Sequence, residues 1–145
     1  MNQIEAVTTW IDAAKQKPSV RNVANYLAYT MSELAECLTA TNSYRLYNLG
    51  MDIERASEDV RRGTYDSVIE SANRTELLDG AIDTAWCAIG LAHMLGDAQG
   101  AFAEVANSNH SKFENGVCEL DATGKVVKGP SYFKPDLAKF LRGAE

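Results

Sequence analysis

The chain has 145 residues, of which 46% are hydrophobic and 23% are charged, and it contains only 3 prolines. This composition is typical of globular proteins and excludes a largely disordered chain. The length suits one domain over residues 1–145 with a substantial core. The formal net charge of −6 argues against nucleic-acid and anionic-membrane partners, because such surfaces are bound through clustered Lys and Arg.

The cysteine pattern and the chain start favour a cytoplasmic protein. Cys37, Cys87 and Cys118 are scattered and lack CxxC spacing, which fits a reducing compartment better than a disulfide framework. Residues 1–17 lack the basic start and apolar run of a signal peptide. Residues 77–95 approach membrane length, but carboxylates in their first half would be costly in lipid, so we expect a buried soluble helix there.

Apolar residues recur at helical spacing over most of the chain. Pro18 should stop the first helix, and Ser19 is the expected N-cap of the second. The third should end near Gly63, and the fourth should run from Thr75 as N-cap to Gly96, a C-terminal stop signal. The expected helical ranges are 4–14, 19–38, 46–63, 75–96 and 98–113.

The fourth predicted helix is apolar almost all round. Such a helix must lie in the middle of a bundle or at an oligomer interface. After residue 113, turn signals at 115–116, 124 and 129–130 predict turns or a short hairpin, and Pro135 can open a last short helix. The sequence therefore predicts an all-α helical bundle of four to five helices with an irregular C-terminal turn or hairpin segment.

Two pairs of carboxylates have spacings that place both members on one helical face. Glu33 and Glu36 are three residues apart, and Asp79 and Asp83 are four apart, which brings each pair within about 5–6 Å at Cβ. Buried carboxylates need cations or protonation, and Mg²⁺ with its oxygen ligands is an economical partner. The alternatives are a solvated helix edge for the glutamates and stabilisation by the helix dipole for the aspartates, which accounts for Asp79 better than for Asp83.

Three segments together resemble the all-α NTP pyrophosphohydrolase superfamily, which includes MazG-like proteins and the phosphoribosyl-ATP pyrophosphohydrolase-like proteins common in phages. SELAE at residues 32–36 is similar to the family's EExxE with Ser32 in place of the leading Glu. LDGAID at 78–83 is similar to its ExxD or DxxxD segment; an alternative alignment uses Glu76 and Asp79. EVANSNHSKF at 104–113, followed by GKVVKGPSYFKPD at 124–136, resembles the phage-type ending SNxSK…GKxxKGPxYxxPD.

The resemblance implies a homodimer or homotetramer that cleaves a nucleoside triphosphate, or its deoxy form, into the monophosphate and pyrophosphate. It implies Mg²⁺ as cofactor, with Mn²⁺ as a substitute, and the host cytoplasm as location if the chain is phage-encoded. Relatives act on pyrimidine nucleotides or on purine nucleotides, and no residue here selects between them; a purine such as (d)GTP is the substrate we expect for a phage-like member. The residues carried over are Glu33, Glu36, Asp79 and Asp83 as metal ligands and Asn109, Lys112, Lys128 and Tyr132 as substrate-binding residues.

The charges of the predicted site residues indicate a mechanism. Four carboxylates would repel a triphosphate, so catalysis should require metal ions to offset that charge and to activate water for attack at the α-phosphorus. Glu36 is the favoured general base, with Glu33 the other catalytic candidate, while Lys112 and Lys128 could stabilise the leaving pyrophosphate. The rival reading is a non-catalytic nucleotide-binding or helical interaction protein, which Ser32 and Gly80 at positions where the family often has Glu would support.

Overall fold

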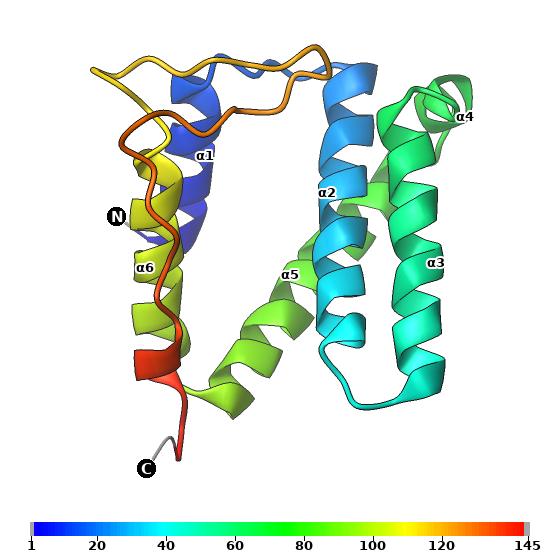
Figure 1. Cartoon of the computed structure of the whole chain (residues 1–145). Helices are drawn as coiled ribbons and strands as arrows, with labels where there is room; N and C mark the ends of the chain where they lie inside the picture. Colours follow the sequence, from blue (N-terminus) through cyan, green and yellow to red (C-terminus); the bar gives the residue numbers. More distant parts are fainter. Residues whose placement is uncertain (1, 144–145) are drawn as a thin grey trace. The chain divides into compact units, whose positions relative to one another are not determined.

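The computed structural model describes residues 2–143, and this part of the chain is helical with no regular β-strand (Figure 1). The predicted all-α class is confirmed. None of the described helices has both the length and the apolar character needed to cross a membrane. The elements are α1 (Gln3–Ala13), α2 (Val20–Thr39), α3 (Tyr44–Arg61), α4 (Asp66–Glu70), α5 (Arg74–Leu95), α6 (Ala98–His110) and the 3₁₀ helix η1 (Ala138–Phe140).

Side-chain caps fix the helix starts, and one of them differs from the prediction. The Ser19 hydroxyl accepts a 3.0 Å hydrogen bond from the Asn22 N–H, as expected for the N-cap of α2. The fourth predicted helix, α5, is capped by Asn73 and not by Thr75. The Asn73 carbonyl oxygen accepts from the main-chain N–H groups of Thr75 and Glu76 at 3.1 and 3.3 Å. An Asn side chain reaches two orphan donors at once, so α5 begins two residues earlier.

Other boundaries also differ. α6 ends at His110, three residues before the predicted end, and α4 is a short helix that the sequence pattern did not predict. The region after α6 has the predicted turns, together with an isolated bridge between Glu114 and Val117 and another between Leu141 and Gly96 at the end of α5. The last predicted helix is reduced to one 3₁₀ turn.

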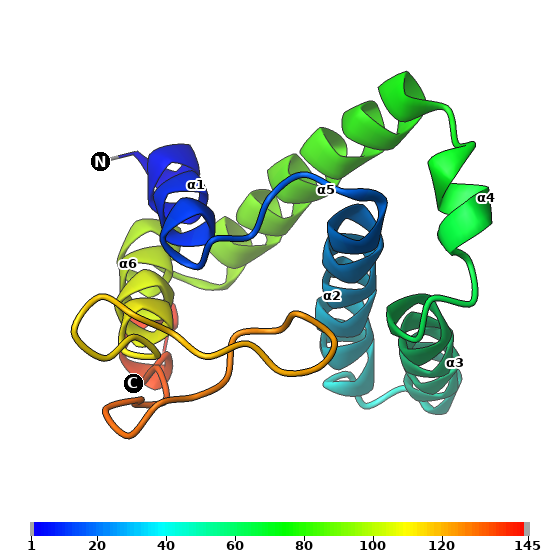
Figure 2. The ribbon, with the colours of Figure 1, turned by 90° about the horizontal axis from the view of Figure 1, so that it is seen from above.

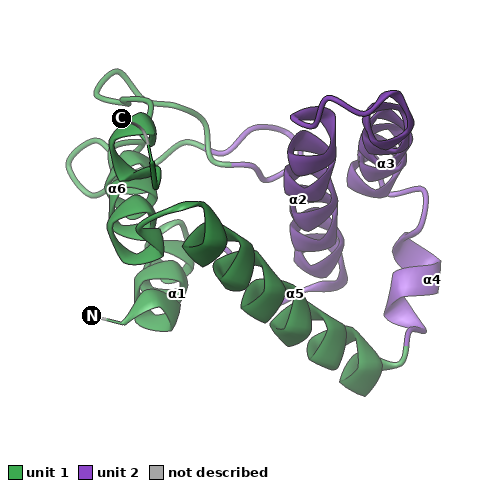
Figure 3. Ribbon diagram, turned by 90° about the horizontal axis from the view of Figure 1, so that it is seen from below, with its two compact units in different colours: residues 1–15, 73–119, 126–145 green, residues 16–72, 120–125 purple. Residues whose placement is uncertain are grey.

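The chain forms two compact units (Figure 3). Unit 1 comprises residues 1–15, 73–119 and 126–145, and unit 2 comprises residues 16–72 and 120–125. The C-terminal segment therefore leaves unit 1 at residue 120, contributes a short loop to unit 2 and returns at residue 126.

Unit 2 is built on α2 and α3, which lie side by side and antiparallel (Figure 2). Ala24 and Ala28 of α2 pack with Val60 of α3 in a small buried core. A Cβ on Gly50 would lie 2.9 Å from the carbonyl oxygen of Ala35, so only glycine lets the two helix backbones approach this closely.

Arg21, near the start of α2, makes an ion pair and a hydrogen bond to the main chain within unit 2. The Arg21 guanidinium lies 2.8 Å from the Asp66 carboxylate and donates a 2.7 Å hydrogen bond to the Val60 carbonyl. Arg21 thereby joins α2 to the end of α3 and to α4.

Unit 1 contains α1 packed beside α6. The Trp10 indole N–H donates a 3.0 Å hydrogen bond to the Asn109 carbonyl, and its ring meets that of Phe113 edge to face. The C-terminal segment joins the α5–α6 corner, where the Asp97 N–H donates to the Phe140 carbonyl at 2.9 Å. These contacts tie both ends of the chain to α6.

Helix α5 was predicted to lie in the middle of a bundle or at an oligomer interface, and within the described chain it is not in a buried position. None of its residues is buried in the described chain. Trp86, Leu78 and Ile82 are 79%, 64% and 60% exposed. A helix that is apolar on nearly every side offers a surface for further packing, because large exposed apolar patches mark contact surfaces.

Candidate functional site

The predicted glutamates lie on one flank of α2. Ala28 and Ala35 are buried, and Ser32 is bonded to α3. Tyr29, Glu33 and Glu36 each follow one of these residues, and one residue turns a helix by about 100°. Tyr26 likewise follows the buried Asn25. The α2 flank therefore consists of Tyr26, Tyr29, Glu33 and Glu36.

The two glutamates are exposed on this flank. Ser32, which stands where the resembled motif has its leading Glu, points to α3 and pairs with the Ser57 hydroxyl at 2.9 Å. Ser57 is fully buried and donates to the Glu54 carbonyl at 2.8 Å. Position 32 thus joins two helices, and Glu33 and Glu36 are the two carboxylates of the SELAE segment.

The loop at residues 120–125 is bonded near Tyr26, the N-terminal end of the α2 flank. The Asn25 amide donates a 2.8 Å hydrogen bond to the Thr123 carbonyl, and the Gln16 amide donates a 2.9 Å bond to the Gly124 carbonyl. The Tyr26 hydroxyl donates to the Gln16 side-chain oxygen at 2.7 Å. Two buried amides therefore fix two successive carbonyls of a loop that is distant in sequence.

The loop brings a cation to the tyrosines. The ammonium of Lys125 lies 5.8 Å from the ring centre of Tyr29, which meets Tyr26 edge to face at 5.5 Å. Burial, with the neighbouring Tyr29, raises the pKa of Tyr26 to about 12. Burial, with Asp121 nearby, also raises the pKa of Tyr29. Glu33 follows Tyr29 by about one helical turn, or roughly 6 Å along the axis. This end of unit 2 combines aromatic rings, a cation and carboxylates.

The loop itself is rigidified by one carboxylate oxygen. Asp121 Oδ1 accepts from the Thr123 N–H at 2.8 Å, the Thr123 hydroxyl at 2.7 Å and the Lys125 N–H at 3.1 Å. These bonds lower the pKa of Asp121, the Thr123 hydroxyl having the largest effect. The loop therefore has a defined shape that does not depend on a ligand.

The predicted aspartates lie in unit 1 on α5, and both are exposed. Glu76, Asp79 and Asp83 follow one another at spacings of three and four residues, so all three occupy one stripe of the helix. Both alignments of the resembled motif, with Glu76 or with Asp83 as the second ligand, use this stripe.

The predicted substrate-binding residues form two close pairs within unit 1. The Lys112 ammonium donates a 2.7 Å hydrogen bond to the Asn109 side-chain oxygen and lies 5.8 Å from the Trp10 ring centre. The Lys128 ammonium lies 4.6 Å above the ring of Tyr132. Each pair holds a cation beside a polar or aromatic group.

Two serines of the SNxSK segment have a role that sequence reasoning missed. Ser108, 3% exposed, donates a 2.7 Å bond to the Phe133 carbonyl. The Ser111 hydroxyl accepts from the Phe133 N–H at 3.1 Å and donates to the Ser108 carbonyl at 2.7 Å. The serines thus bind both main-chain groups of one residue in the C-terminal segment. Their spacing of three on a helix was the available signal.

Two glutamates hold the same segment by its N–H groups. Glu104 accepts from the Asp136 N–H at 3.1 Å and pairs with Lys139 at 3.3 Å. Glu114 accepts from the Ser131 N–H at 2.8 Å. The hydrogen bonds lower the pKa of both carboxyl groups. The segment after Gly129 is therefore anchored along α6.

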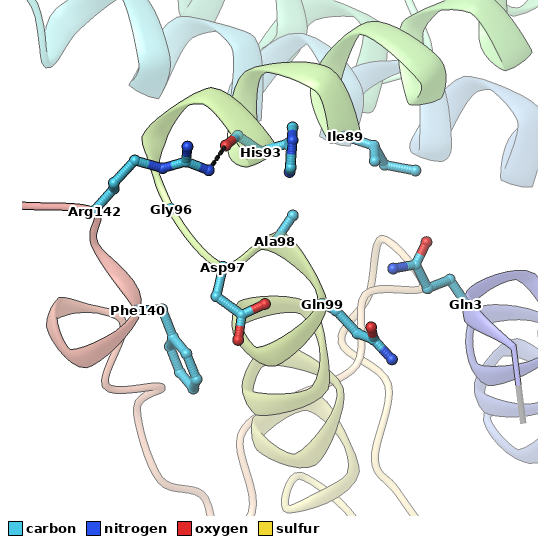
Figure 4. Close-up of a pocket in the computed structure, with 9 residues that line it drawn as sticks. All are labelled: Gln3, Ile89, His93, Gly96, Asp97, Ala98, Gln99, Phe140 and Arg142. Carbon is cyan, nitrogen blue, oxygen red and sulfur yellow. Dashed lines mark hydrogen bonds between the residues drawn. The ribbon is translucent and has the colours of Figure 1, made fainter.

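A pocket of about 650 Å³ lies at the α5–α6 corner of unit 1 (Figure 4). His93, Asp97, Phe140 and Arg142 contribute to its lining, and the Arg142 guanidinium donates to the His93 carbonyl at 3.1 Å. None of the predicted site residues lines this pocket.

The four predicted metal ligands are divided between the units, the glutamate pair in unit 2 and the aspartate pair in unit 1. Over residues 2–143, no three His, Cys, Asp or Glu side chains are gathered so that they could hold one metal ion. Comparison of the chain with protein-family models, with curated proteins and with solved structures found no match.

Proposed function

We propose that the chain is a magnesium-dependent pyrophosphohydrolase that cleaves an NTP or dNTP, with a purine such as (d)GTP as preferred substrate, into the monophosphate and pyrophosphate. The proposal rests on the sequence motifs together with one structural observation. The loop at 120–125, where the GKxxKGP segment begins, is bonded to the Tyr26 end of the α2 flank. Lys125 of that segment lies 5.8 Å from the ring centre of Tyr29, and Tyr29 precedes Glu33 by about one helical turn.

The carboxylates have the chemistry that a hard cation requires. Glu33 and Glu36 are exposed on one flank of α2, and Asp79 and Asp83 are exposed on one stripe of α5. Carboxylate oxygens are the ligands that Mg²⁺ prefers, and Mn²⁺ accepts the same set. When bound, the metal would offset the triphosphate charge and lower the pKa of a water molecule.

Proton transfer and stabilisation of the leaving group are assigned to side chains of the protein. Glu36 is the proposed general base, its carboxylate taking the proton of the attacking water, while Glu33 shares the same flank. Lys112 and Lys128 supply positive charge for the departing pyrophosphate. Asn109 orients the Lys112 ammonium through their 2.7 Å hydrogen bond, and Tyr132 holds Lys128 by a cation–π contact.

The test is a product assay. The protein is incubated with each of the common dNTPs and NTPs and with Mg²⁺, and pyrophosphate and inorganic phosphate are measured separately. We expect pyrophosphate with at least one nucleotide, loss with EDTA and recovery with Mg²⁺ or Mn²⁺. Glu36→Gln should lower kcat by at least about 100-fold, the lower end of what general acid–base catalysis contributes, and Asp83→Asn should lower kcat because it removes a proposed metal ligand.

Matched control variants distinguish the loss of a site residue from a general loss of folded structure. Glu70→Gln and Asp12→Asn make the same chemical changes at exposed carboxylates outside the predicted site, and both should retain full turnover. Circular dichroism must show unchanged helix content in all four variants. Full activity in Glu36→Gln and Asp83→Asn would refute the site assignment. Absence of pyrophosphate release with every nucleotide and both metals would refute the enzymatic proposal.

The second candidate is a protein that binds a nucleotide, or another protein, without cleaving the nucleotide. The observation that favours it is the Ser32–Ser57 hydrogen bond, which uses the leading motif position to join α2 to α3. Calorimetry distinguishes the candidates: nucleotide binding in Mg²⁺ without turnover selects the binding protein.

A further inference from the structure

Lys125 is a cation of the GKxxKGP segment to which the sequence resemblance assigns no role. It lies in the loop at 120–125, which belongs to unit 2 together with α2 and its residues Glu33 and Glu36 (Figure 3). Lys128, the second lysine of the same segment, lies in unit 1. The structure therefore associates Lys125 directly with the helix that carries the two glutamates.

The main chain at Lys125 is fixed beside α2 by bonds on both sides of Gly124. The Asn25 amide donates a 2.8 Å hydrogen bond to the Thr123 carbonyl, and the Lys125 N–H donates to the Asp121 carboxylate at 3.1 Å. Gly124 has a φ of 88°, and a Cβ at this position would lie 3.4 Å from the Asn25 amide nitrogen. The point from which the Lys125 side chain projects is therefore defined before any ligand binds.

The Lys125 ammonium is held by an aromatic ring and not by a carboxylate. Its nitrogen lies over the Tyr29 ring, 5.8 Å from the ring centre, which is within the range of a cation–π contact. Within residues 2–143 this ammonium makes no ion pair with an acidic side chain. Lys125 is also exposed. Its positive charge is thus oriented by the ring and accessible to an anion from solvent.

Tyr29 places this charge next to the glutamates along α2. Tyr29, Glu33 and Glu36 are spaced by four and three residues, so they follow one side of the helix. Four residues advance an α-helix by about 6 Å. The flexible four-carbon stem of a lysine allows small adjustments of the ammonium over such a distance. An anionic chain bound to a metal at Glu33 could therefore extend to Lys125.

We infer that the Lys125 ammonium binds an oxygen of the substrate's triphosphate chain, beside the metal site that Glu33 and Glu36 are proposed to form. The inference rests on the proposed pyrophosphohydrolase function and adds a residue to its binding site. An ammonium is a compact charge with three hydrogen-bond donors, which suits phosphate oxygens. Because Tyr29 already restricts the ammonium, less side-chain entropy is lost when the phosphate binds.

The contacts of the Tyr29 ring favour a phosphate over a nucleobase at this position. Lys125 lies over the ring, and the Tyr26 ring meets it edge to face at 5.5 Å with an interplanar angle of 74°. A base that stacked on Tyr29 would compete with the ammonium for the ring. The group that complements this end of the α2 flank is therefore anionic.

The first experiment measures steady-state kinetics with the nucleotide that gives the most pyrophosphate. Lys125→Met removes the charge but keeps the N–H that bonds to Asp121. KM should rise at least about 10-fold, as expected for the loss of a hydrogen bond to a charged group. An interaction made equally in the substrate complex and the transition state changes KM and leaves kcat nearly unchanged. Lys125→Arg retains the charge and should recover most of the affinity. Lys17→Met, the same change at an exposed lysine of unit 2, is the control.

The second experiment measures binding without turnover. Calorimetry follows the titration of the protein with inorganic tripolyphosphate in Mg²⁺, a probe that has neither base nor sugar. Lys125→Met should bind at least about 10-fold more weakly than the wild type, and Lys17→Met should bind equally well. The difference should narrow as NaCl is added, because salt screens exposed charges. Hydrogen exchange at residues 123–125 should be the same in Lys125→Met and the wild type.

The outcomes separate this inference from the proposed function. Unchanged KM and unchanged tripolyphosphate affinity in Lys125→Met would overturn the inference and leave the pyrophosphohydrolase standing. A chain that releases no pyrophosphate, but loses tripolyphosphate affinity in Lys125→Met, would refute the enzyme and support the binding role. A wild-type chain that does not bind tripolyphosphate would overturn the inference. Weaker binding with faster exchange at 123–125, in Lys125→Arg as well as Lys125→Met, would also overturn it, because Lys125 would then act only by holding the loop.

Discussion

The side-chain amide of Asn25 on α2 donates a 2.8 Å hydrogen bond to the main-chain carbonyl of Thr123, 98 residues later in the chain. Asn25 is 1% exposed, and its own side-chain oxygen is buried without a hydrogen-bond partner among the described residues. A polar side chain buried so fully on an otherwise alanine-rich helix face specifies one docking position for the loop at 120–125. This contact joins the loop at 120–125 to the helix that carries Glu33 and Glu36.

Asn25→Ala should release this loop. The substitution removes the donor to the Thr123 carbonyl, and we expect a loss of about 1–3 kcal/mol in the free energy of unfolding. Hydrogen exchange should increase at the N–H groups of residues 123–125. Asn48→Ala, which removes an exposed bond to the carbonyl of its own helix, is the control and should change little. Unchanged exchange in the loop of Asn25→Ala would contradict the assigned role.

Gly50→Ala tests the close approach of α2 and α3. Alanine favours a helix over glycine by about 1 kcal/mol, but the added Cβ would lie 2.9 Å from the Ala35 carbonyl oxygen. We expect overpacking to dominate and the free energy of unfolding to fall by about 1–3 kcal/mol. In Gly90→Ala on α5, the new Cβ meets nothing within 4 Å, so stability should rise by about 0.5–1 kcal/mol. Urea denaturation measures both, and equal effects would refute the packing argument.

Ser108→Ala should loosen the C-terminal segment from α6. It leaves the Phe133 carbonyl without its 2.7 Å donor, at an expected cost of about 1–3 kcal/mol. Limited proteolysis should cleave residues 126–137 faster than in the wild type. Ser71→Ala removes only a local, exposed bond to the Val68 carbonyl and should change stability by less than about 0.5 kcal/mol. Identical proteolysis of the two variants would show that Ser108 does not anchor the segment.

Acid should weaken one of the contacts that hold the same segment. The Asp136 N–H and Lys139 lower the pKa of Glu104 below its ordinary 4.5. Because the folded pKa is depressed, the stabilisation by Glu104 is complete above the unfolded pKa and is lost as pH falls through the folded pKa. NMR titration of the Glu104 carboxyl should therefore give a midpoint below 4.5, and the Asp136 amide signal should shift with the same midpoint. In Glu104→Gln that amide shift should vanish, and a Glu104 midpoint at or above 4.5 would contradict the assigned hydrogen bond and ion pair.

The sequence by itself determined the helical class and most helix positions. Apolar spacing and the Ser19 cap are local signals, and they were sufficient because a helix satisfies its backbone hydrogen bonds within its own segment. The α5 boundary moved by two residues because Asn73 and Thr75 are both competent caps, and only the folded chain selects between them. The short α4 was missed because five residues carry little periodic signal.

The tertiary structure decided which distant residues meet. In the folded chain Asn25 is bonded to Thr123, and Lys112 and Lys128 lie beside Asn109 and Tyr132. The hydroxyl groups of Ser108 and Ser111 are hydrogen-bonded to the main chain of Phe133. No periodicity encodes such contacts, since they join segments whose spacing in sequence is arbitrary and whose meeting depends on the whole path of the chain. The sequence likewise shows that α5 is apolar almost all round, whereas its few contacts with the rest of unit 1 are seen only in the folded chain, where none of its residues is buried.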